Sequence, residues 1–552
     1  MSAPMCDMLL KNVCKFCNVR SHIQRQVGRC RFKHDGHHSV IKVDEQAVDK
    51  MEKGGITFKK HPGLIGLRTV KIPAELEKSI DVTIENYPLS NLREKAKTLY
   101  RYLQSRREPV EQSVFNTKLL EIEEEMKKKA NVDVEELDVA GKEKYENEMR
   151  RQITKRVKKL IYHWQPMKYD APKAIQYLVA RTAADYSSIL HCLKEIKNKD
   201  PEFEPRAIYD FGSGVGTTVW AANKIWNTGV FEYYCVDKSS EMNTLARLLL
   251  QDGQEQKNMR ISGVYFRNYS PSDNQNKFNI VVCANTLMDL SSSDERHDLI
   301  EKLWNMTEDY LVLIEKGGYS GFRLINEARN LLLSKSADKD DPSLGHVFSP
   351  CSHDKSCPKL KDRNSPCFFE TKYTPLKQFE PSGTAQKEWF SYLIFKTGPR
   401  KQGIVWPRII QQVKKPARHT HCHLCCADGT LRHVVISDAK HGKGLYKCSR
   451  YSQWGDQLPA IIVPQSDESD EKSQQSNTET QISSENIDND NLISTLEHVV
   501  LTSSEQSSDE LSEQKDSHVE TNQSVRTNDE QNESRGEQYE SRGVPDYNLT
   551  NS

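Results

Sequence analysis

The sequence predicts an α/β protein whose central domain is a doubly wound, parallel sheet. Between residues 206 and 317, short apolar runs of β type alternate with helical segments, which is typical of parallel strands joined by crossover helices. A glycine-rich turn joins the first strand to its helix, and an aspartate ends the second strand. With 552 residues, the chain is long enough for two or three domains around this core.

The individual elements follow from apolar periodicity. Strands are expected at 207–211, 233–237, 263–266, 279–283 and 310–315, and a further strand at 390–395 would add an edge. Helices are expected at 174–180, after Gly216, at 242–250 and near 299–304. After residue 406 we expect short β-like segments, among them 432–436 and 444–447.

Composition divides the whole chain into six regions. They are a basic leader (1–34), an N-terminal helical region (35–170), the α/β domain (171–330), a Cys-rich insertion (331–385), the last sheet strand with a basic β-rich extension (386–464) and a disordered acidic tail (465–552). The formal net charge of zero hides this division. Residues 466–552 hold 21 acidic and 5 basic residues, which leaves 73 basic and 57 acidic residues in the remainder. Such a basic surplus is typical of proteins that bind phosphate backbones, although an anionic membrane surface would attract it too.

The leader has the composition of a mitochondrial transit peptide. Its 34 residues contain seven Lys or Arg and one acid, with scattered apolar residues and no long apolar core of a secretory signal. A disordered basic arm is the alternative interpretation. No run of 18 apolar residues occurs in the sequence, so we expect no transmembrane segment. The 14 cysteines indicate thiols or metal ligands in a reducing compartment.

The glycine-rich turn indicates a nucleoside-containing cofactor. Its spacing is Gly-x-Gly-x-Gly, and an aspartate 21 residues past the third glycine can accept hydrogen bonds from both ribose hydroxyls. This spacing favours S-adenosylmethionine over a dinucleotide, since S-adenosylmethionine has no pyrophosphate to hold. The alternative is an ordinary tight turn between a strand and a helix. The candidate cofactor-binding residues are Asp210, Gly212, Gly214, Gly216, Asp237 and Asn285.

No catalytic residue can be assigned for a methyl transfer. Positioning alone accelerates such a reaction, but the segment Asn285–Asp289 after the fourth strand lacks the Pro-Pro-aromatic turn that amino-group methyltransferases use to hold a base. Asn285 and Asp289 remain candidates to line the pocket. Cys283 lies inside the strand, so we expect a core position rather than a nucleophile.

Three cysteines in the insertion predict a metal site. Cys351, Cys357 and Cys367 lie within seventeen residues of a polar segment, and each adjoins a proline. A fourth thiolate can come from the segment 421–426, where the candidates are Cys422, Cys425 and Cys426. Four thiolates suit zinc or a [4Fe-4S] cluster equally well. His353 is a possible zinc ligand, but a bystander role is the simpler interpretation.

A basic stretch follows the insertion and predicts RNA contact. From Trp389 to Ala427 the chain has no acidic residue, and its cations alternate with aromatic residues that can stack on bases. Some of these aromatic residues are also expected in the sheet core. The seven cations are Lys396, Arg400, Lys401, Arg408, Lys414, Lys415 and Arg418.

Several of these motifs together resemble the methyltransferase-like protein 17 family of mitochondrial small-subunit ribosome proteins. They are the glycine loop, Ser-Pro-Cys-Ser-His-Asp-Lys-Ser-Cys-Pro at 349–358, Phe-Ser-Tyr-Leu at 390–393, Trp-Pro-Arg at 406–408, His-Leu-Cys-Cys-Ala-Asp-Gly at 423–429 and Trp-Gly-Asp at 454–456. The resemblance covers residues 170 to 460 and implies a class I S-adenosylmethionine methyltransferase fold with a [4Fe-4S] cluster on Cys351, Cys357, Cys367 and Cys425. The acidic tail is a departure from the family.

The resemblance also implies a function. It indicates an assembly factor in the mitochondrial matrix that binds small-subunit ribosomal RNA and ribosomal proteins, as a monomer on the particle, with methyltransferase activity lost or not essential. An active ribosomal RNA methyltransferase is the alternative. A zinc-dependent regulatory protein is a third hypothesis, which a zinc ion at the four thiols would favour.

Overall fold

The computed structural model describes residues 39–53, 55–88, 90–130, 138–160, 164–271, 276–336, 345–360, 365–403 and 405–464. The predicted leader and acidic tail lie outside these residues. No helix within the described ranges combines the length and apolarity that a membrane-spanning segment needs.

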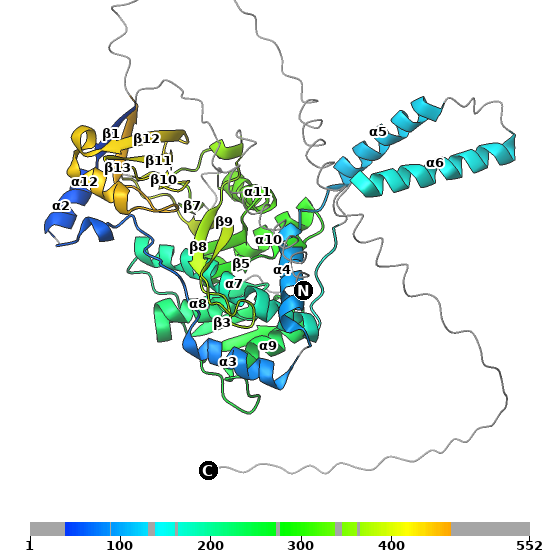
Figure 1. Cartoon of the computed structure of the whole chain (residues 1–552), viewed down its shortest axis with the longest axis horizontal. Helices are drawn as coiled ribbons and strands as arrows, with labels where there is room; N and C mark the ends of the chain where they lie inside the picture. Colours follow the sequence, from blue (N-terminus) through cyan, green and yellow to red (C-terminus); the bar gives the residue numbers. More distant parts are fainter. Residues whose placement is uncertain are drawn as a thin grey trace, which may run out of the picture. The chain divides into compact units, whose positions relative to one another are not determined.

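A mixed sheet forms the centre of the fold (Figure 1). Within the described residues it has eight strands in the order β4-β3-β2-β5-β6-β9-β7, with β8 also paired to β9. They are β2 (Ala207–Phe211), β3 (Glu232–Val236), β4 (Val264–Arg267), β5 (Phe278–Ala284), β6 (Thr307–Lys316), β7 (Gly345–Ser349), β8 (Phe369–Tyr373) and β9 (Gln386–Thr397). The five strands from β2 to β6 are parallel, which confirms the predicted doubly wound core.

The last strand, β9, departs from the prediction that it would add an edge to the sheet. β9 runs antiparallel to β6 and to both strands that precede it, and it lies inside the sheet rather than at its edge. The edge prediction was wrong because the Cys-rich region supplies two strands, β7 and β8, that pair with β9. Cys351 therefore lies two residues after the end of β7, and Cys367 lies two residues before the start of β8.

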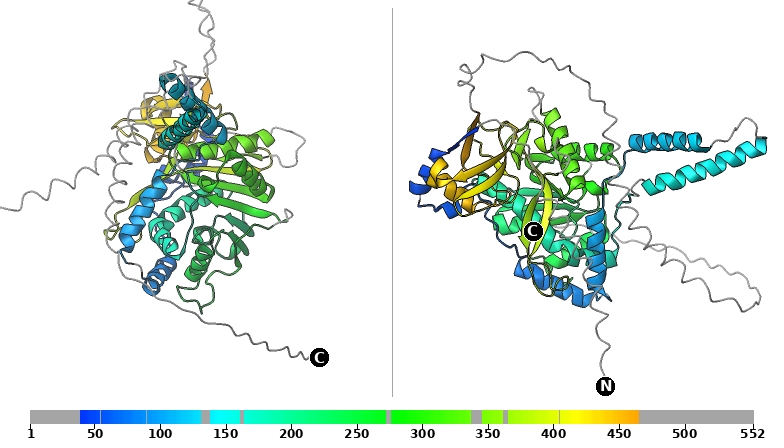
Figure 2. Two further views of the ribbon diagram at one scale, coloured as in Figure 1. Left: turned by 90° about the vertical axis from the view of Figure 1, so that its right-hand side faces the viewer. Right: turned by 45° about the horizontal axis from the view of Figure 1, so that its top comes forward.

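Helices cover both faces of the sheet, as Figure 2 shows. Alternate residues of β5 point to opposite sides, because side chains alternate along a strand. Ile280 and Val282 join a core with α7, α8 and α9, whereas Val281 and Cys283 join a second core with α10 and α11. These helices are α7 (Ala171–Lys199), α8 (Thr217–Trp226), α9 (Ser240–Leu250), α10 (Ser293–Asn305) and α11 (Tyr319–Lys335). Cys283 is fully buried, which confirms its predicted core position.

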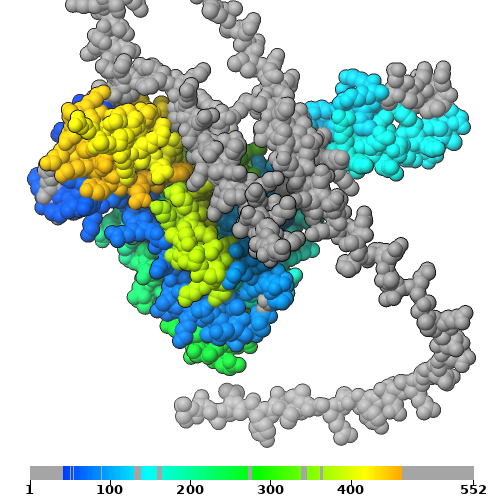
Figure 3. Space-filling model, in the orientation of Figure 1, coloured from blue at the N-terminus to red at the C-terminus, as the bar shows by residue number. Residues whose placement is uncertain are grey.

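The N-terminal helices pack in two ways. α3 (Ala74–Asn86) and α4 (Leu92–Ser105) lie against the α/β domain, where they contact α9 and α7 respectively. α5 (Gln112–Ala130) and α6 (Val139–Leu160) form a hairpin that extends away from the sheet, as the space-filling view in Figure 3 shows. A small apolar cluster of their own holds the hairpin together, centred on Ile122, Ile153 and Val157.

Both ends of the described chain build a smaller C-terminal lobe with a separate core. β10 (Arg408–Ile409), β11 (His419–Cys425) and β12 (Leu431–Ser437) form its three-stranded sheet, and β13 (Ala460–Pro464) pairs with β1 (Ser39–Val43). The lobe also contains α2 (Glu45–Lys53) and α12 (Asp438–Tyr451).

The predicted β-like segment at 444–447 lies in helix α12, so that prediction was wrong. The side chain of Ser437 caps the helix by accepting a hydrogen bond from the backbone N–H of Lys440. Leu445, Cys448 and Ser449 follow at helical spacing and are buried against the lobe. The cap and this burial favour a helix over a strand.

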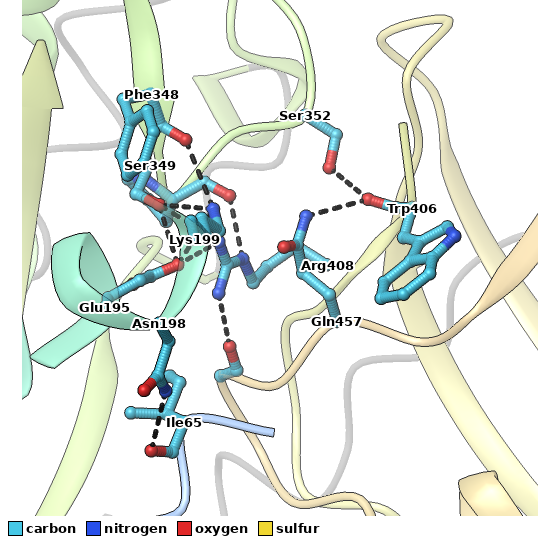
Figure 4. A network of polar contacts seen from close by, with 12 residues as sticks. Ile65, Glu195, Asn198, Lys199, Phe348, Ser349, Ser352, Trp406, Arg408 and Gln457 are labelled. Carbon is cyan, nitrogen blue, oxygen red and sulfur yellow. Dashed lines mark hydrogen bonds and ion pairs between the residues drawn. The ribbon is translucent and has the colours of Figure 1, made fainter. Parts of the chain in front are cut away.

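A buried charge network joins the lobe to the α/β domain (Figure 4). Arg408 of β10 and Glu195 of α7 are both almost fully buried and form an ion pair. Arg408 also donates to the carbonyl oxygens of Pro350 and Gly455, at 2.8 and 2.6 Å. The Tyr392 hydroxyl of β9 donates to the second oxygen of Glu195 at 2.6 Å. One guanidinium thus connects α7, the segment after β7 and the C-terminal lobe.

The pKa values of Glu195 and Lys199 depend on the other charges of this network. Burial alone would raise the pKa of Glu195, but the neighbouring Arg408 and Lys199 charges hold that pKa well below its usual range. Burial lowers the pKa of Lys199 to about 8, although Glu195 opposes the effect. Removal of the guanidinium would therefore leave a carboxylate buried without its main counter-ion.

We expect Arg408→Met to lower the free energy of unfolding by about 3 to 5 kcal/mol, because a buried carboxylate loses its partner. Urea denaturation followed by fluorescence measures this change. Arg260→Met is the matched control, since Arg260 pairs with Asp252 at the surface and such pairs contribute about 1 kcal/mol or less. Equal unfolding midpoints for the two variants would contradict a supporting role for the buried pair.

Candidate functional site

The predicted glycine loop has a backbone that requires glycine. It follows β2 and leads into α8, and Gly212, Gly214 and Gly216 have φ angles of 72°, 52° and 75°. These values lie in the left-handed region, which L-residues rarely adopt. A Cβ atom on Gly212 would also lie 2.1 Å from Oγ1 of Thr286, which follows β5. The loop is thus fitted closely against the end of the neighbouring strand.

Asp237 lies beside this loop, where the sequence predicts a ribose-binding carboxylate. It follows β3, and its two carboxylate oxygens accept hydrogen bonds from the backbone N–H groups of Gly214, at 3.0 Å, and Ser239, at 2.9 Å. Burial raises the pKa of Asp237, and these two hydrogen bonds oppose the effect. The carboxylate is therefore held at the carboxyl end of the parallel strands, next to the glycine loop.

Asp210 is a second buried carboxylate at this end of the sheet. Burial raises its pKa to about 7, a hydrogen bond from Thr218 opposes this, and the nearby charge of Asp237 raises it further. Its Oδ2 atom has no hydrogen-bond partner among the described residues. An unpaired buried carboxylate oxygen is costly. A ligand with a positively charged amino group would satisfy it.

Asn285 is bonded to helix α7. It follows β5 with a φ of 56°, and its side chain donates to Asp185 of α7 at 3.1 Å. Asp185 also pairs with Arg181 and accepts a hydrogen bond from the Tyr177 hydroxyl at 2.7 Å. The Asn285 amide thus links the end of β5 to α7. The other five predicted cofactor residues, Asp210, Gly212, Gly214, Gly216 and Asp237, lie in β2, in the glycine loop and after β3.

The segment after β5 is bonded to other parts of the chain. Asp289 forms an ion pair with the buried Arg106 at 2.6 Å and accepts a hydrogen bond from the backbone N–H of Met167 at 3.2 Å. The indole of Trp164 donates to the carbonyl oxygen of Met288 at 2.9 Å. Residues from the two sides of the α5–α6 hairpin therefore occupy the strand end where a methyltransferase would receive its acceptor. Sequence reasoning missed Arg106, Trp164 and Met167 because no local motif marks them.

The four predicted thiols lie together. Burial raises the pKa of Cys357 to about 11, and the neighbouring Cys351 raises it further. Burial likewise raises the pKa of Cys367 and of Cys425, and in both cases the other thiols of the set add to the effect. These mutual effects place Cys425, at the end of β11, near the three cysteines of the insertion. Cys357 and Cys425 are buried, whereas Cys351 and Cys367 are half-buried.

The other two candidates for the fourth thiol lie elsewhere. Cys422 and Cys426 belong to the apolar core of the C-terminal lobe. Burial raises the pKa of each, and the other influences come from Thr420 and Lys415 for Cys422, and from Asp428, Arg432 and Thr430 for Cys426. Neither is affected by the three cysteines of the insertion. The Nε2 atom of His353 lies 3.4 Å from the sulfur of Cys425, so His353 adjoins the thiol group.

Many residues of the acid-free stretch from Trp389 to Ala427 are bonded or buried within the protein. Four of its seven cations are bonded within the chain: Lys396 to Asp200, Arg400 to Asp354, Arg408 to Glu195 and Lys415 to the carbonyl oxygen of Ser452. The aromatic residues Phe390, Tyr392 and Phe395 are buried in the sheet. The remaining cations, Lys401, Lys414 and Arg418, are exposed.

We expect Asp210→Asn to stabilise the ligand-free protein at pH 8 by roughly 1 to 3 kcal/mol, because it removes a buried charge. The folded-state pKa of Asp210 is raised, so its penalty grows as pH rises toward about 7. The gain should therefore shrink between pH 8 and pH 5. Thermal unfolding at both values measures this, with the exposed Asp298→Asn as control. A gain that does not vary with pH would show that the pKa of Asp210 is not raised in the folded protein, because the carboxyl would then be ionised in both the folded and the unfolded state at pH 5 and at pH 8.

Comparisons with known proteins agree with the resemblance seen in the sequence. A human protein, "Ribosome assembly protein METTL17, mitochondrial", is 35% identical over 404 residues, which cover 73% of this chain and 86% of that protein. "Rsm22-cox11 tandem protein 2, mitochondrial" of Schizosaccharomyces pombe is 24% identical over 327 residues, which cover 52% of this chain and 43% of that protein.

Solved structures with partial similarity include two methyltransferases. Magnesium protoporphyrin IX methyltransferase from Synechocystis with bound S-adenosylmethionine has 12% identity and a TM-score of 0.26, over 43% of this chain and 88% of that chain. A putative RNA methyltransferase from Pyrococcus horikoshii has 13% identity and a TM-score of 0.24, over 38% and 82%.

The family model described as "Mitochondrial small ribosomal subunit Rsm22" matches residues 171–459. This range contains the whole α/β sheet, the glycine loop and all four thiols of the predicted metal site. The match and the identity to the human protein confirm the resemblance, and the chain belongs to the Rsm22 family of mitochondrial small ribosomal subunit proteins.

Proposed function

We propose that this chain is an assembly factor of the small ribosomal subunit in the mitochondrial matrix. It binds ribosomal RNA and ribosomal proteins as a monomer, and its methyltransferase-like fold performs no essential methyl transfer. The ribosomal role is supported by the description of the family and by that of the human relative. The excess of 73 basic over 57 acidic residues before residue 466 supports binding to phosphate backbones.

One observation carries the non-catalytic part of the proposal. The ion pair between Arg106 and Asp289, with the hydrogen bonds from Trp164 and Met167, fills the end of β5 with the protein's own side chains. A methyl acceptor must reach this end of the sheet to lie in line with a donor. An acceptor would have to displace a buried guanidinium from its carboxylate, which is energetically costly.

The residues present fit S-adenosylmethionine as a bound group. When bound, it supplies an electrophilic methyl group. We propose that Asp237 accepts hydrogen bonds from its ribose hydroxyls, that the backbone at Gly212 to Gly216 lies against it, and that Asp210 faces its amino group. The raised pKa and unpaired oxygen of Asp210 support this assignment, because a cationic group would lower the cost of its buried charge.

An active ribosomal RNA methyltransferase is the second candidate, since the glycine loop and Asp237 have the backbone and placement that cofactor binding requires. The two proposals differ in whether assembly depends on the cofactor or only on the fold. The cofactor residues and the thiols can be tested separately, because they belong to different elements. The glycine loop and Asp237 follow β2 and β3, whereas the thiols follow β7, precede β8 and end β11.

Asp237→Ala should abolish S-adenosylmethionine binding but leave small-subunit assembly close to the parent level, because the ribose contact is lost and the fold is kept. Cys351→Ser should impair assembly. Sucrose-gradient analysis of mitochondrial small subunits, in cells that depend on the variant, provides the readout, and calorimetry provides cofactor affinity. Arrest of assembly by Asp237→Ala at normal protein abundance would favour the enzyme and reject the non-catalytic proposal.

We further propose that Cys351, Cys357, Cys367 and Cys425 hold a [4Fe-4S] cluster. In such a cluster each thiolate binds a different iron atom, so the four sulfurs lie farther apart than around a single ion. As they stand, no three His, Cys, Asp or Glu side chains of the described residues are arranged to hold one metal ion. The four thiols are nonetheless close enough to raise each other's pKa. A spacing wider than that around a single ion is the arrangement that a cluster needs.

The protein environment also supports a cationic centre at the thiols. Burial disfavours free thiolates, and a cluster or metal ion would offset this cost through direct bonds to sulfur. Ser391 of β9 donates to the carbonyl oxygen of Cys367, and Arg408 donates to the carbonyl oxygen of Pro350 beside Cys351. These contacts fix the backbone of two of the four proposed ligands.

Protein purified without oxygen should contain iron and acid-labile sulfide in equal amounts, and Cys425→Ser should lose most of both because one ligand is missing. Cys426→Ser, at the adjacent buried position in the lobe core, is the matched control and should keep them. Iron and sulfide assays with visible absorption spectra report the result. Zinc in place of iron, or equal losses in the two variants, would reject the proposed cluster.

A further inference from the structure

One face of the C-terminal sheet carries a row of histidines that the proposed function does not use. His419, His421 and His423 alternate along β11, so their side chains point to the same face. On the neighbouring antiparallel strand β12, His433 lies directly opposite His423. Residues from two strands thus bring four imidazoles to one surface.

The rings are close enough to share a ligand. Nδ1 of His421 lies 3.1 Å from Nε2 of His433, at a solvent-accessible position. The rings of His423 and His433 stack with centroids 4.4 Å apart and an interplanar angle of 12°. The ring of His419 packs edge-on against the ring of His421, with the ring centroids 5.0 Å apart. His421, His423 and His433 therefore form the compact part of the row.

This arrangement has the chemistry of a transition-metal site. Imidazole nitrogen is a preferred ligand of zinc, copper and nickel ions, and three histidines hold zinc in some enzymes. With zinc to nitrogen bonds of about 2.0 to 2.1 Å in a tetrahedron, two ligand nitrogens lie about 3.3 Å apart. The 3.1 Å separation of the His421 and His433 nitrogens is close to this value. Two ligands are thus nearly in place.

The charge of Lys414 acts on His421. It also repels a bound cation, so we expect a moderate affinity rather than that of a closed structural site.

We infer that His421 and His433 bind a divalent first-row transition-metal ion such as zinc, with His423 as the third ligand and water completing the shell. The stacked ring of His423 turns about its side-chain bonds to reach the ion, which is why the resting side chains do not already form a group of three. Cys425 follows His423 by two residues on the same strand and contacts His353, so a second measurement distinguishes the histidine row from the proposed cluster. The inference does not depend on the proposed function.

The test uses the full-length chain without a polyhistidine tag, purified without oxygen so that any cluster stays intact. Equilibrium dialysis against Zn²⁺, followed by elemental analysis, measures uptake and affinity. We expect the parent to bind about one added zinc ion, and His421→Gln and His433→Gln each to weaken binding by about tenfold or more. His297→Gln, at a partly exposed histidine on α10, is the matched control and should leave binding unchanged. Parent-like zinc affinity in both row variants would overturn the inference.

A second measurement separates the histidines from the thiols. Co²⁺ bound by nitrogen and water shows only weak visible bands, whereas cobalt bound by thiolate gives intense charge-transfer absorption. We expect the weak spectrum in the parent and its loss in His433→Gln, with unchanged thermal unfolding in the presence of a chelator. Intense absorption that disappears in Cys351→Ser would show that the ion occupies the cysteines and would overturn the assignment.

Discussion

The buried ion pair between Arg408 and Glu195 is the contact on which the arrangement of this chain depends. Glu195 belongs to the long helix α7 that covers one face of the sheet, and Arg408 begins the C-terminal lobe. Arg408 is also the direct cross-strand partner of Cys425, and it donates to the carbonyl oxygen next to Cys351. Arg408 therefore fixes the lobe against the sheet through its guanidinium, and it is linked to two proposed ligands, to Cys425 through its backbone and to the residue beside Cys351 through its side chain.

Two carboxylates near the ends of the parallel strands, Asp210 and Asp289, differ in whether they have a partner within the protein. At the glycine loop, Asp210 keeps an unpaired buried oxygen and a raised pKa, which are features of a site that gains stability from a ligand. At the end of β5, Asp289 is already paired with Arg106. Of these two carboxylates, only Asp210 keeps an oxygen that a bound ligand could pair with, which is the basis for the proposed non-catalytic role.

Local patterns in the sequence were sufficient to predict the parallel strands, the glycine loop, Asp237 and the group of cysteines. Each of these depends on residues close together in the chain or on a fixed spacing. The contacts that were missed are long-range: Arg106 reaches Asp289 across more than 180 residues, and β1 pairs with β13 at the opposite end of the described chain. The partners of the basic stretch could not be predicted for a related reason, because the acids that pair with its cations, such as Asp200 and Glu195, lie far away in the sequence.

We propose that the charge network between the sheet and the lobe brings the four thiols together. Iron and acid-labile sulfide content of Glu195→Gln, purified without oxygen, tests it most directly. Within the described part of the chain, Glu195 is bonded to Arg408, Ser349, Tyr392 and Lys199 and to none of the four cysteines. We expect a soluble protein with clearly less iron and sulfide than the parent. Full cluster content in this variant would contradict the claim, since the thiols would then converge without the buried carboxylate.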